Sequence, residues 1–159
     1  MTGLIDLLIF LAAVGSGLMS GLFFVFSNFA MKALEKLPPN YGSAAMRSIN
    51  VTIINPWFLT VFVGTAVCGL LSTVLAILNW GEPRMLWILC GSGLYIAGCM
   101  GVTFAFNVPL NNKLAASDPE SQEGIVEWQV YLARWTPWNH VRTVATLAAT
   151  IGFLGALSL

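Results

Sequence analysis

Amide side chains, tryptophans and a single arginine gather where four apolar stretches of the chain begin or end. They are Asn28, Asn55, Asn107, Asn111, Asn112, Trp135, Trp138, Asn139, His140 and Arg142. Asn139 precedes Arg142 by three residues and Trp138 precedes it by four, so a helix places the three on one side. An arginine about one turn inside an apolar stretch normally faces the protein interior and has a polar partner there. We therefore expect Arg142 to be a functional cation rather than one that reaches out to the membrane surface.

Helical spacing predicts that other polar residues share faces rather than form a ring. Two sets are spaced this way: Thr103, Asn107 and Asn111, and Phe24, Asn28 and Met31. We expect Asn28, Asn107, Asn111 and Phe24 to contribute to a binding face. For Asn107 an alternative stays open, because its amide could instead satisfy backbone carbonyls freed by Pro109.

Several of the polar and aromatic residues have a structural explanation. Asn55 before Pro56, and Thr136 before Pro137, are each typical of a helix cap followed by proline at the first helical position. Trp57, Trp80 and Trp87 fall near the predicted membrane edges. Tryptophans at that level ordinarily form an interfacial belt, which we predict for these three.

The histidine and cysteine counts argue against a metal centre. His140 is the only histidine, so one chain cannot supply a bis-histidine haem or the Glu-x-x-His sets of di-iron proteins. Cys68, Cys90 and Cys99 lie inside apolar stretches and form no C-x-x-C pair, which indicates small core residues rather than a disulfide framework or a zinc site. We predict no metal and no cofactor. A regular helix turns His140 about 160° away from Trp138, so the residues alone leave its role open.

The composition identifies the solvent that these residues must tolerate. Of 159 residues 57% are hydrophobic and 9% are charged, whereas a soluble domain has about 25% charged residues. The chain is therefore expected to lie in lipid, as a single four-helix transmembrane domain over residues 1–159. Its formal net charge of +0 argues against nucleic acid as a partner.

Four apolar stretches are long enough to cross about 30 Å of hydrocarbon as helices. They run from Leu4 to Phe29, Trp57 to Leu78, Met85 to Leu110 and Trp138 to Leu157. The first contains Asp6 and lacks a basic start, so we interpret it as a retained span rather than a signal peptide. No alternating strand pattern is present, and we predict an all-α membrane bundle of four transmembrane helices.

Small residues spaced four apart mark three of these spans. The stripes are Ala13, Gly17 and Gly21; Gly93, Ala97 and Gly101; and Ala148, Gly152 and Ala156. Such stripes allow close approach of helix backbones in lipid. We favour packing inside the bundle over a dimer motif, although a homo-oligomer stays open.

Two of the three connections carry helical patterns of their own. One, after Pro38 and Pro39, has Met46, Ile49, Asn50 and Ile53 on one face, and the other, after Pro119, has Ile125, Trp128 and Leu132 at helical spacing. We predict two interfacial helices over the same mouth of the bundle. Lys32, Lys36, Arg47, Lys113 and Arg134 lie on this side and only Arg84 on the other. The positive-inside rule then predicts a bacterial inner membrane protein with both termini extracytoplasmic.

An apolar pocket rimmed by aromatic rings and amides, with one cation at its depth, suits a flat and weakly acidic aromatic molecule. The cation and the amide donors would stabilise the anion of such a molecule, as oxyanion donors do elsewhere. The lipid bilayer and a small aromatic substrate are therefore the partners that we expect.

Five sequence elements extend this picture. They are Gly-Leu-Phe-Phe-Val-Phe-Ser-Asn-Phe at 21–29, Leu-Pro-Pro at 37–39, Ile-Asn and Asn-Pro-Trp-Phe between 49 and 58, Phe-Asn-Val-Pro-Leu-Asn at 106–111, and Trp-Thr-Pro-Trp-Asn-His-Val-Arg-Thr at 135–143. Together they resemble the anthrone oxygenase family of small membrane proteins, and the resemblance covers nearly the whole chain. Many bacterial members of that family have no assigned function.

The resemblance implies a reaction and roles for several residues. Fungal members of the family oxidise an anthrone to an anthraquinone with dioxygen, without a metal or flavin. By this resemblance Arg142 and Asn139 hold the enolate oxygen, and His140 serves as the base. Trp135, Trp138 and Phe106 would stack on the rings of the substrate.

Two other classes of function stay open on the sequence. A haem- or quinone-binding redox protein would use His140 as one ligand. A non-enzymatic membrane partner or assembly protein would use its glycine stripes for contacts and its amides only to hold helix ends. A pocket at the mouth of the bundle distinguishes this last class from the others.

Overall fold

The computed structural model describes residues 2–159, and within that range every regular element is a helix. The elements are α1 (Thr2–Val25), η1 (Phe26–Ala30), α2 (Met31–Glu35), α3 (Pro39–Thr52), α4 (Pro56–Leu78), α5 (Met85–Gly93), η2 (Leu94–Gly101), η3 (Thr103–Asn107), α6 (Val108–Ala116) and α7 (Gln122–Leu157). The elements labelled η are π-helical. Several follow one another without a break, so four continuous apolar helices result: Gly3–Glu35, Pro56–Leu78, Met85–Ala116 and Gln122–Leu157. The predicted all-α bundle of an integral membrane protein is confirmed.

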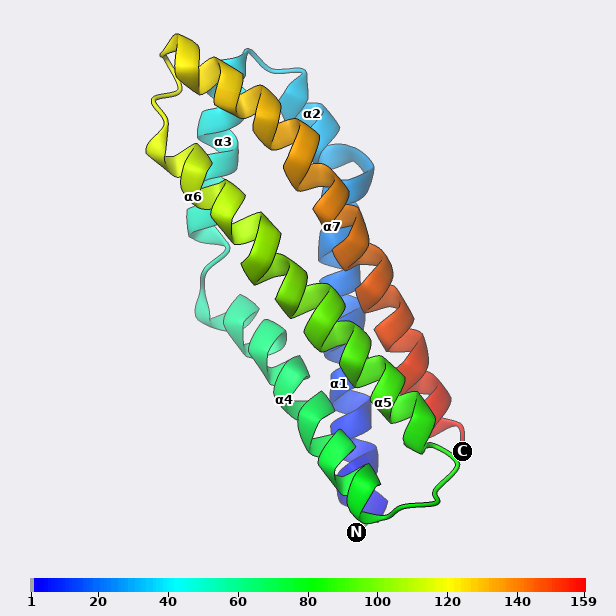
Figure 1. Ribbon diagram of the computed structural model, residues 1–159. Coiled ribbons are helices and arrows are strands. Elements are labelled where there is room, and N and C mark those ends of the chain that lie inside the picture. The colour runs from blue at the N-terminus through cyan, green and yellow to red at the C-terminus, as the bar shows by residue number, and fades with distance from the viewer. Residues whose placement is uncertain (1) are drawn as a thin grey trace.

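The four long helices run side by side in the bundle (Figure 1). α1 packs against α7 and α4, and α5 packs against α7 and α4. Both termini lie at the same end as the link between α4 and α5, whereas α3, α6 and the start of α7 lie at the other end. At the end with the termini, Arg84 forms a salt bridge with Asp6, which gives the carboxylate of the first span a partner. The other end carries the site.

Hydroxyl groups in the middle of the bundle are satisfied by backbone carbonyls of neighbouring helices. Ser16 donates to the Thr146 carbonyl at 2.8 Å, and Tyr95 donates to the Phe62 carbonyl at 3.0 Å. Lipid offers no such acceptors, so these polar groups determine which helix faces point inward.

For one stripe of small residues, the prediction that it packs inside the bundle is wrong. Gly152 and Ala156 of the last stripe are buried as expected. The stripe of Gly93, Ala97 and Gly101 is exposed, because the neighbouring face with Ser92 and Tyr95 is the one turned inward. Ser92 donates to the Gly69 carbonyl there at 2.9 Å.

The predicted caps have different outcomes. Asn55 caps α4 as expected, since its side chain accepts from the Phe58 N–H at 3.1 Å and Pro56 occupies the first turn. Thr136 and Pro137 do not start a helix, because α7 runs continuously from Gln122 through Pro137. A proline inside a helix removes one backbone hydrogen bond, which this long helix tolerates.

The two long connections also differ from each other. α3 is a separate helix after the prolines, as predicted. The stretch from Ile125 to Leu132 is not a separate interfacial helix but the first part of α7, which begins where the Ser121 hydroxyl accepts from the Gly124 N–H at 3.0 Å. The fourth span is therefore longer than the predicted Trp138 to Leu157, and its extra turns stand beside α3 (Figure 1).

The π-helical segments change which residues share a face. Phe24 and Asn28 are exposed whereas Met31 is buried, so the predicted common face of these three residues is wrong. η1, which includes Asn28, lies between Phe24 and Met31 and holds more residues per turn than an α-helix, which rotates the chain that follows it. This rotation points Met31 into an apolar cluster with Met46, Leu114, Trp128, Tyr131 and Trp135.

Candidate functional site

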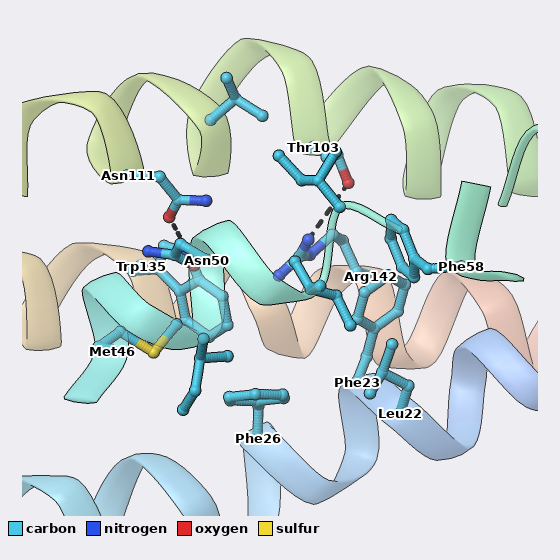
Figure 2. Close-up of a pocket in the computed structure, with 14 residues that line it drawn as sticks. Leu22, Phe23, Phe26, Met46, Asn50, Phe58, Thr103, Asn111, Trp135 and Arg142 are labelled. Carbon is cyan, nitrogen blue, oxygen red and sulfur yellow. Dashed lines mark hydrogen bonds between the residues drawn. The ribbon is translucent and has the colours of Figure 1, made fainter. Parts of the chain in front are cut away.

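A cavity of about 130 Å³ lies beneath α3, between the first, third and fourth long helices and the start of α4. We call it the α3 cavity. Its lining consists of Leu22, Phe23, Phe26, Met46, Ile49, Asn50, Ile53, Ile54, Phe58, Thr103, Val108, Asn111, Trp135 and Arg142. Figure 2 shows aromatic rings from several elements around it, with polar side chains from the third helix and α7. Neither a histidine nor a carboxylate is among these lining residues.

Arg142 is the only charged residue in this lining, and it is 5% exposed. It donates to the Asn139 amide oxygen at 2.7 Å and to the Thr103 hydroxyl at 3.3 Å. Its guanidinium carbon lies 4.3 Å from the centroid of the Phe23 ring and 5.0 Å from that of Trp135. Within residues 2–159 it forms no salt bridge, and its Nε has no hydrogen-bond partner. The cavity therefore contains a buried positive charge without a carboxylate to neutralise it.

Asn139 holds this arginine in place. Its Nδ2 donates to the Phe23 carbonyl at 2.8 Å and to the Ser27 hydroxyl at 2.7 Å, and its oxygen faces Arg142. The amide is fully buried and does not line the α3 cavity. It connects α7 to the first helix at the junction of α1 and η1, so it acts on the site through Arg142.

A second polar group, the Asn111 amide, lies farther along the third helix. Its oxygen accepts hydrogen bonds from the Tyr131 hydroxyl at 2.8 Å and from Trp135 Nε1 at 2.9 Å. Tyr131 is buried, and its ring stacks on that of Trp135 with centroids 5.8 Å apart. The α3 cavity thus has Arg142 and Asn111 at separate positions, with Trp135 in contact with both.

Asn107 takes part in structure rather than in the lining. It is buried, and its Nδ2 donates to the Trp135 carbonyl at 3.3 Å, while its Oδ1 has no partner within residues 2–159. The acceptor belongs to α7 and not to the turn preceding Pro109, so the amide links two helices.

The remaining predicted site residues lie away from the α3 cavity. Phe106 and Trp138 stack on each other, with centroids 3.6 Å apart and an angle of 6° between the rings. Phe24, Asn28 and His140 are exposed. Of the predicted residues the structure therefore brings Arg142, Asn111 and Trp135 into one lining, with Asn139 directly behind them.

Other lining residues were not among the predicted site residues. Phe23 lies in the last turn of α1 and Phe26 is the first residue of η1, and their spacing of three residues places both on the face that lines the cavity. Met46, Ile49, Asn50 and Ile53 had a readable signal, because their helical spacing predicted one face of a helix over the mouth. That face covers the cavity.

Comparison with known proteins identifies the family. Residues 57–152 match the family model described as anthrone oxygenase. The chain belongs to the anthrone oxygenase family. Neither the curated proteins nor the solved structures contain a match to this anthrone oxygenase family member. The matched range includes Thr103, Asn111, Trp135 and Arg142, so much of the polar part of the α3 cavity belongs to the family region.

The side chains that line the α3 cavity are not of the types that usually hold a metal ion. Within residues 2–159 no three histidine, cysteine or acidic side chains are grouped closely enough to hold a metal ion. The polar atoms that line the α3 cavity come instead from amides, a hydroxyl, an indole and a guanidinium. Such a set can donate hydrogen bonds to an oxyanion between aromatic faces.

Proposed function

We propose that this protein is a membrane-embedded oxygenase that binds the anion of a flat, phenol- or anthrone-like molecule in the α3 cavity and lets dioxygen oxidise it without a cofactor. The observation that carries the proposal is Arg142, a buried guanidinium that lines an aromatic cavity and that has, among residues 2–159, neither a partner for its Nε nor a counter-charge. Membership of the anthrone oxygenase family supports the oxidative chemistry.

The charge of Arg142 explains why an anion would be preferred. Removing a charged group from water costs several kcal/mol, and the attraction of a nearby opposite charge offsets this cost. No carboxylate within residues 2–159 provides that opposite charge. A bound aromatic oxyanion would provide it. Preorganised donors in a site without water stabilise such an anion more strongly than solvent does. Phe23 and Trp135 lie against the guanidinium and would also contact the ring of the ligand.

The lining suggests how the proton is handled. His140 is exposed and lies outside the α3 cavity, and none of the lining residues is a base of suitable strength. We infer that the site lowers the pKa of the bound molecule itself, so that the proton leaves to water at the mouth. The catalytic contribution of the chain is then to favour ionisation and to exclude water from the anion.

The oxidation of an anthrone balances with dioxygen alone. The enolate, formed when the methylene carbon loses a proton, transfers one electron to dioxygen, and the resulting radical and superoxide join through a new carbon–oxygen bond. The peroxide takes up a proton, the O–O bond breaks, and the remaining hydrogen on that carbon leaves as part of water. One dioxygen is consumed, and a quinone and one water are formed.

The test measures dioxygen uptake and quinone formation from anthrone by the purified protein in detergent. We expect Arg142→Gln to lower kcat/KM at least about 100-fold, as removal of an oxyanion donor does in other enzymes. Arg134→Gln is the matched control, because Arg134 is an exposed arginine on the same helix. A folded Arg142→Gln protein with full activity would refute the proposal, and so would activity that follows the content of a bound metal in elemental analysis.

A further inference from the structure

The hydroxyl group of Thr103 has a proton that no described residue accepts. Its Oγ1 lies 3.3 Å from Arg142 Nη1, and a guanidinium can only donate, so the threonine oxygen is the acceptor in this contact. The hydroxyl proton must therefore point in another direction. Within residues 2–159 it meets no acceptor at hydrogen-bond distance.

Four other threonines of the bundle use this proton inside their own helices. Thr65, Thr143, Thr146 and Thr150 each donate to the carbonyl oxygen four residues earlier, at 2.6 to 2.9 Å. Such a bond is useful in an apolar helix, because a buried hydroxyl without an acceptor is costly. Thr103, the first residue of η3, makes no bond of this kind. Thr73 also lacks a partner, but it lies outside the α3 cavity.

The free proton of Thr103 belongs to a residue that lines the α3 cavity beside Arg142. Figure 2 shows the Thr103 oxygen joined to the guanidinium by a hydrogen bond. The guanidinium donates once to Thr103 and once to Asn139, which leaves other N–H groups, Nε among them, without an acceptor in the described chain. Donors from two different helices thus lie together at this place, and neither has used all of its hydrogen atoms.

The 3.3 Å between Arg142 Nη1 and Thr103 Oγ1 lets both groups serve one ligand atom. Hydrogen bonds to a charged oxygen are about 2.6 to 2.9 Å long, so a single oxygen can lie at that distance from both atoms. An anionic oxygen has more than one lone pair and can accept both bonds. A neutral oxygen gains less, because charge-assisted hydrogen bonds are about twice as strong. The two donors together therefore favour the ionised form of a ligand.

We propose that Thr103 is a second oxyanion donor, whose hydroxyl gives a hydrogen bond to the same ligand oxygen that Arg142 contacts. This inference rests on the proposed function, because it takes an anion bound at Arg142 as its starting point. It adds a separate claim, which is that an uncharged side chain of the third helix also promotes ionisation of the substrate.

A pH titration of bound 4-nitrophenol tests this claim, because the phenolate form of this probe is yellow and the neutral form is not. We expect Thr103→Val, which removes the hydroxyl and nearly keeps the shape, to lower the ionisation constant of the bound probe at least about 10-fold, the effect of one hydrogen bond to a charged group. Thr103→Ser keeps a hydroxyl and should stay within about threefold of the wild type. Thr150→Val is the matched control, since its hydroxyl is bonded within α7 and lies outside the cavity.

The same titration in an Arg142→Lys background distinguishes a direct donor from a residue that only holds the guanidinium. A lysine keeps the charge but lacks the planar group that Thr103 contacts. A direct donor should therefore still lower the ionisation constant by a similar factor when Thr103→Val is added. All variants are compared at probe concentrations that saturate the purified protein in detergent.

Three results would overturn the inference and leave the proposed function intact. They are an unchanged ionisation constant in Thr103→Val, a Thr103→Ser protein that behaves like Thr103→Val, and an effect that disappears in the Arg142→Lys background. The last of these would make Thr103 a positioning residue for Arg142. A wild-type protein that does not raise the ionisation constant of the bound probe above its value in water would instead refute the proposed role of Arg142, and with it this inference.

Discussion

A guanidinium in a membrane protein is stable only where the surrounding residues replace water. Arg142 donates two hydrogen bonds, to Thr103 and Asn139, and contacts two aromatic rings. Contacts between a cation and an aromatic ring are worth about 2 kcal/mol when desolvated. Such contacts hold the side chain without neutralising its charge. The arrangement thus leaves Arg142 available to an anionic ligand.

Asn139→Ala tests how much of this arrangement depends on one amide. The change removes an acceptor of Arg142 and leaves the Phe23 carbonyl and the Ser27 hydroxyl without their shared donor. We expect the free energy of unfolding to fall by about 2 kcal/mol, as for other buried hydrogen bonds to charged groups. Phenolate affinity should fall as well, because the guanidinium is no longer fixed.

The measurement combines thermal unfolding with nitrophenol binding on the same preparation. Val141→Ala is the control, since Val141 is exposed and only two residues away. Unchanged stability together with unchanged affinity in Asn139→Ala would show that Arg142 does not need this partner.

At the scale of elements, the sequence predicted the four spans and the Asn55 cap. It did not predict where a π-helical segment changes which residues of a helix point inward. A membrane span can be predicted because the thickness of the bilayer sets the length of the apolar stretch. A cap can be predicted because it depends on a few adjacent residues. A π-helical segment changes the phase of a helix without a matching change in composition, which is why the predicted common face of Phe24, Asn28 and Met31 was wrong. Pro137 was misplaced because the same residue type is found both at helix starts and inside membrane helices.

Pro137→Ala gives a prediction that separates these two roles of proline. Inside α7 the change restores a backbone N–H and removes a steric clash, so we expect the free energy of unfolding to rise by about 1 to 3 kcal/mol. Pro56→Ala is the matched control, because Pro56 occupies the first turn of α4, where no such bond exists to be restored. Denaturant unfolding in detergent measures both. If Pro137→Ala instead lowers the free energy of unfolding, by as much as Pro56→Ala does, that result contradicts a helix that continues through Pro137.

Two of the glycine stripes offer a second pair of variants that can be compared. Gly152 packs against Gly91, and a Cβ at Gly152 would come within 3.0 Å of the Gly91 Cα. Gly93 has open space where a Cβ would stand. We therefore expect Gly152→Val to destabilise the bundle by about 1 to 3 kcal/mol, the cost typical of overpacking, and Gly93→Val to change it far less. Thermal unfolding of the two variants checks this, and equal losses would mean that the exposed stripe is covered in the membrane.

The whole molecule separates a stabilising half from a functional half. One apolar cluster, which includes Ile9, Ile88 and Phe153, fills the bundle toward the end with the termini. A second cluster, which includes Met46, Trp128 and Trp135, lies under α3 at the other end. The α3 cavity touches the second cluster and also Phe23 of the first, so the site lies where the predicted spans meet α3 and the turns that extend them. Five of the six Lys and Arg residues other than Arg142 also lie at this end, four in these extensions or in α3 and Lys36 in the link before α3.

This charge distribution leads to our proposal that the end with α3 is cytoplasmic in a bacterial inner membrane and that both termini are extracytoplasmic. In a variant without its native cysteines, Ser158→Cys should react with a membrane-impermeant maleimide in intact cells whose outer membrane is permeabilised. Glu120→Cys, at the exposed link before α7, should react only after the inner membrane is opened. The opposite pattern would invert the topology. It would also move the mouth of the α3 cavity, and the water that receives the substrate proton, to the outer face of the membrane.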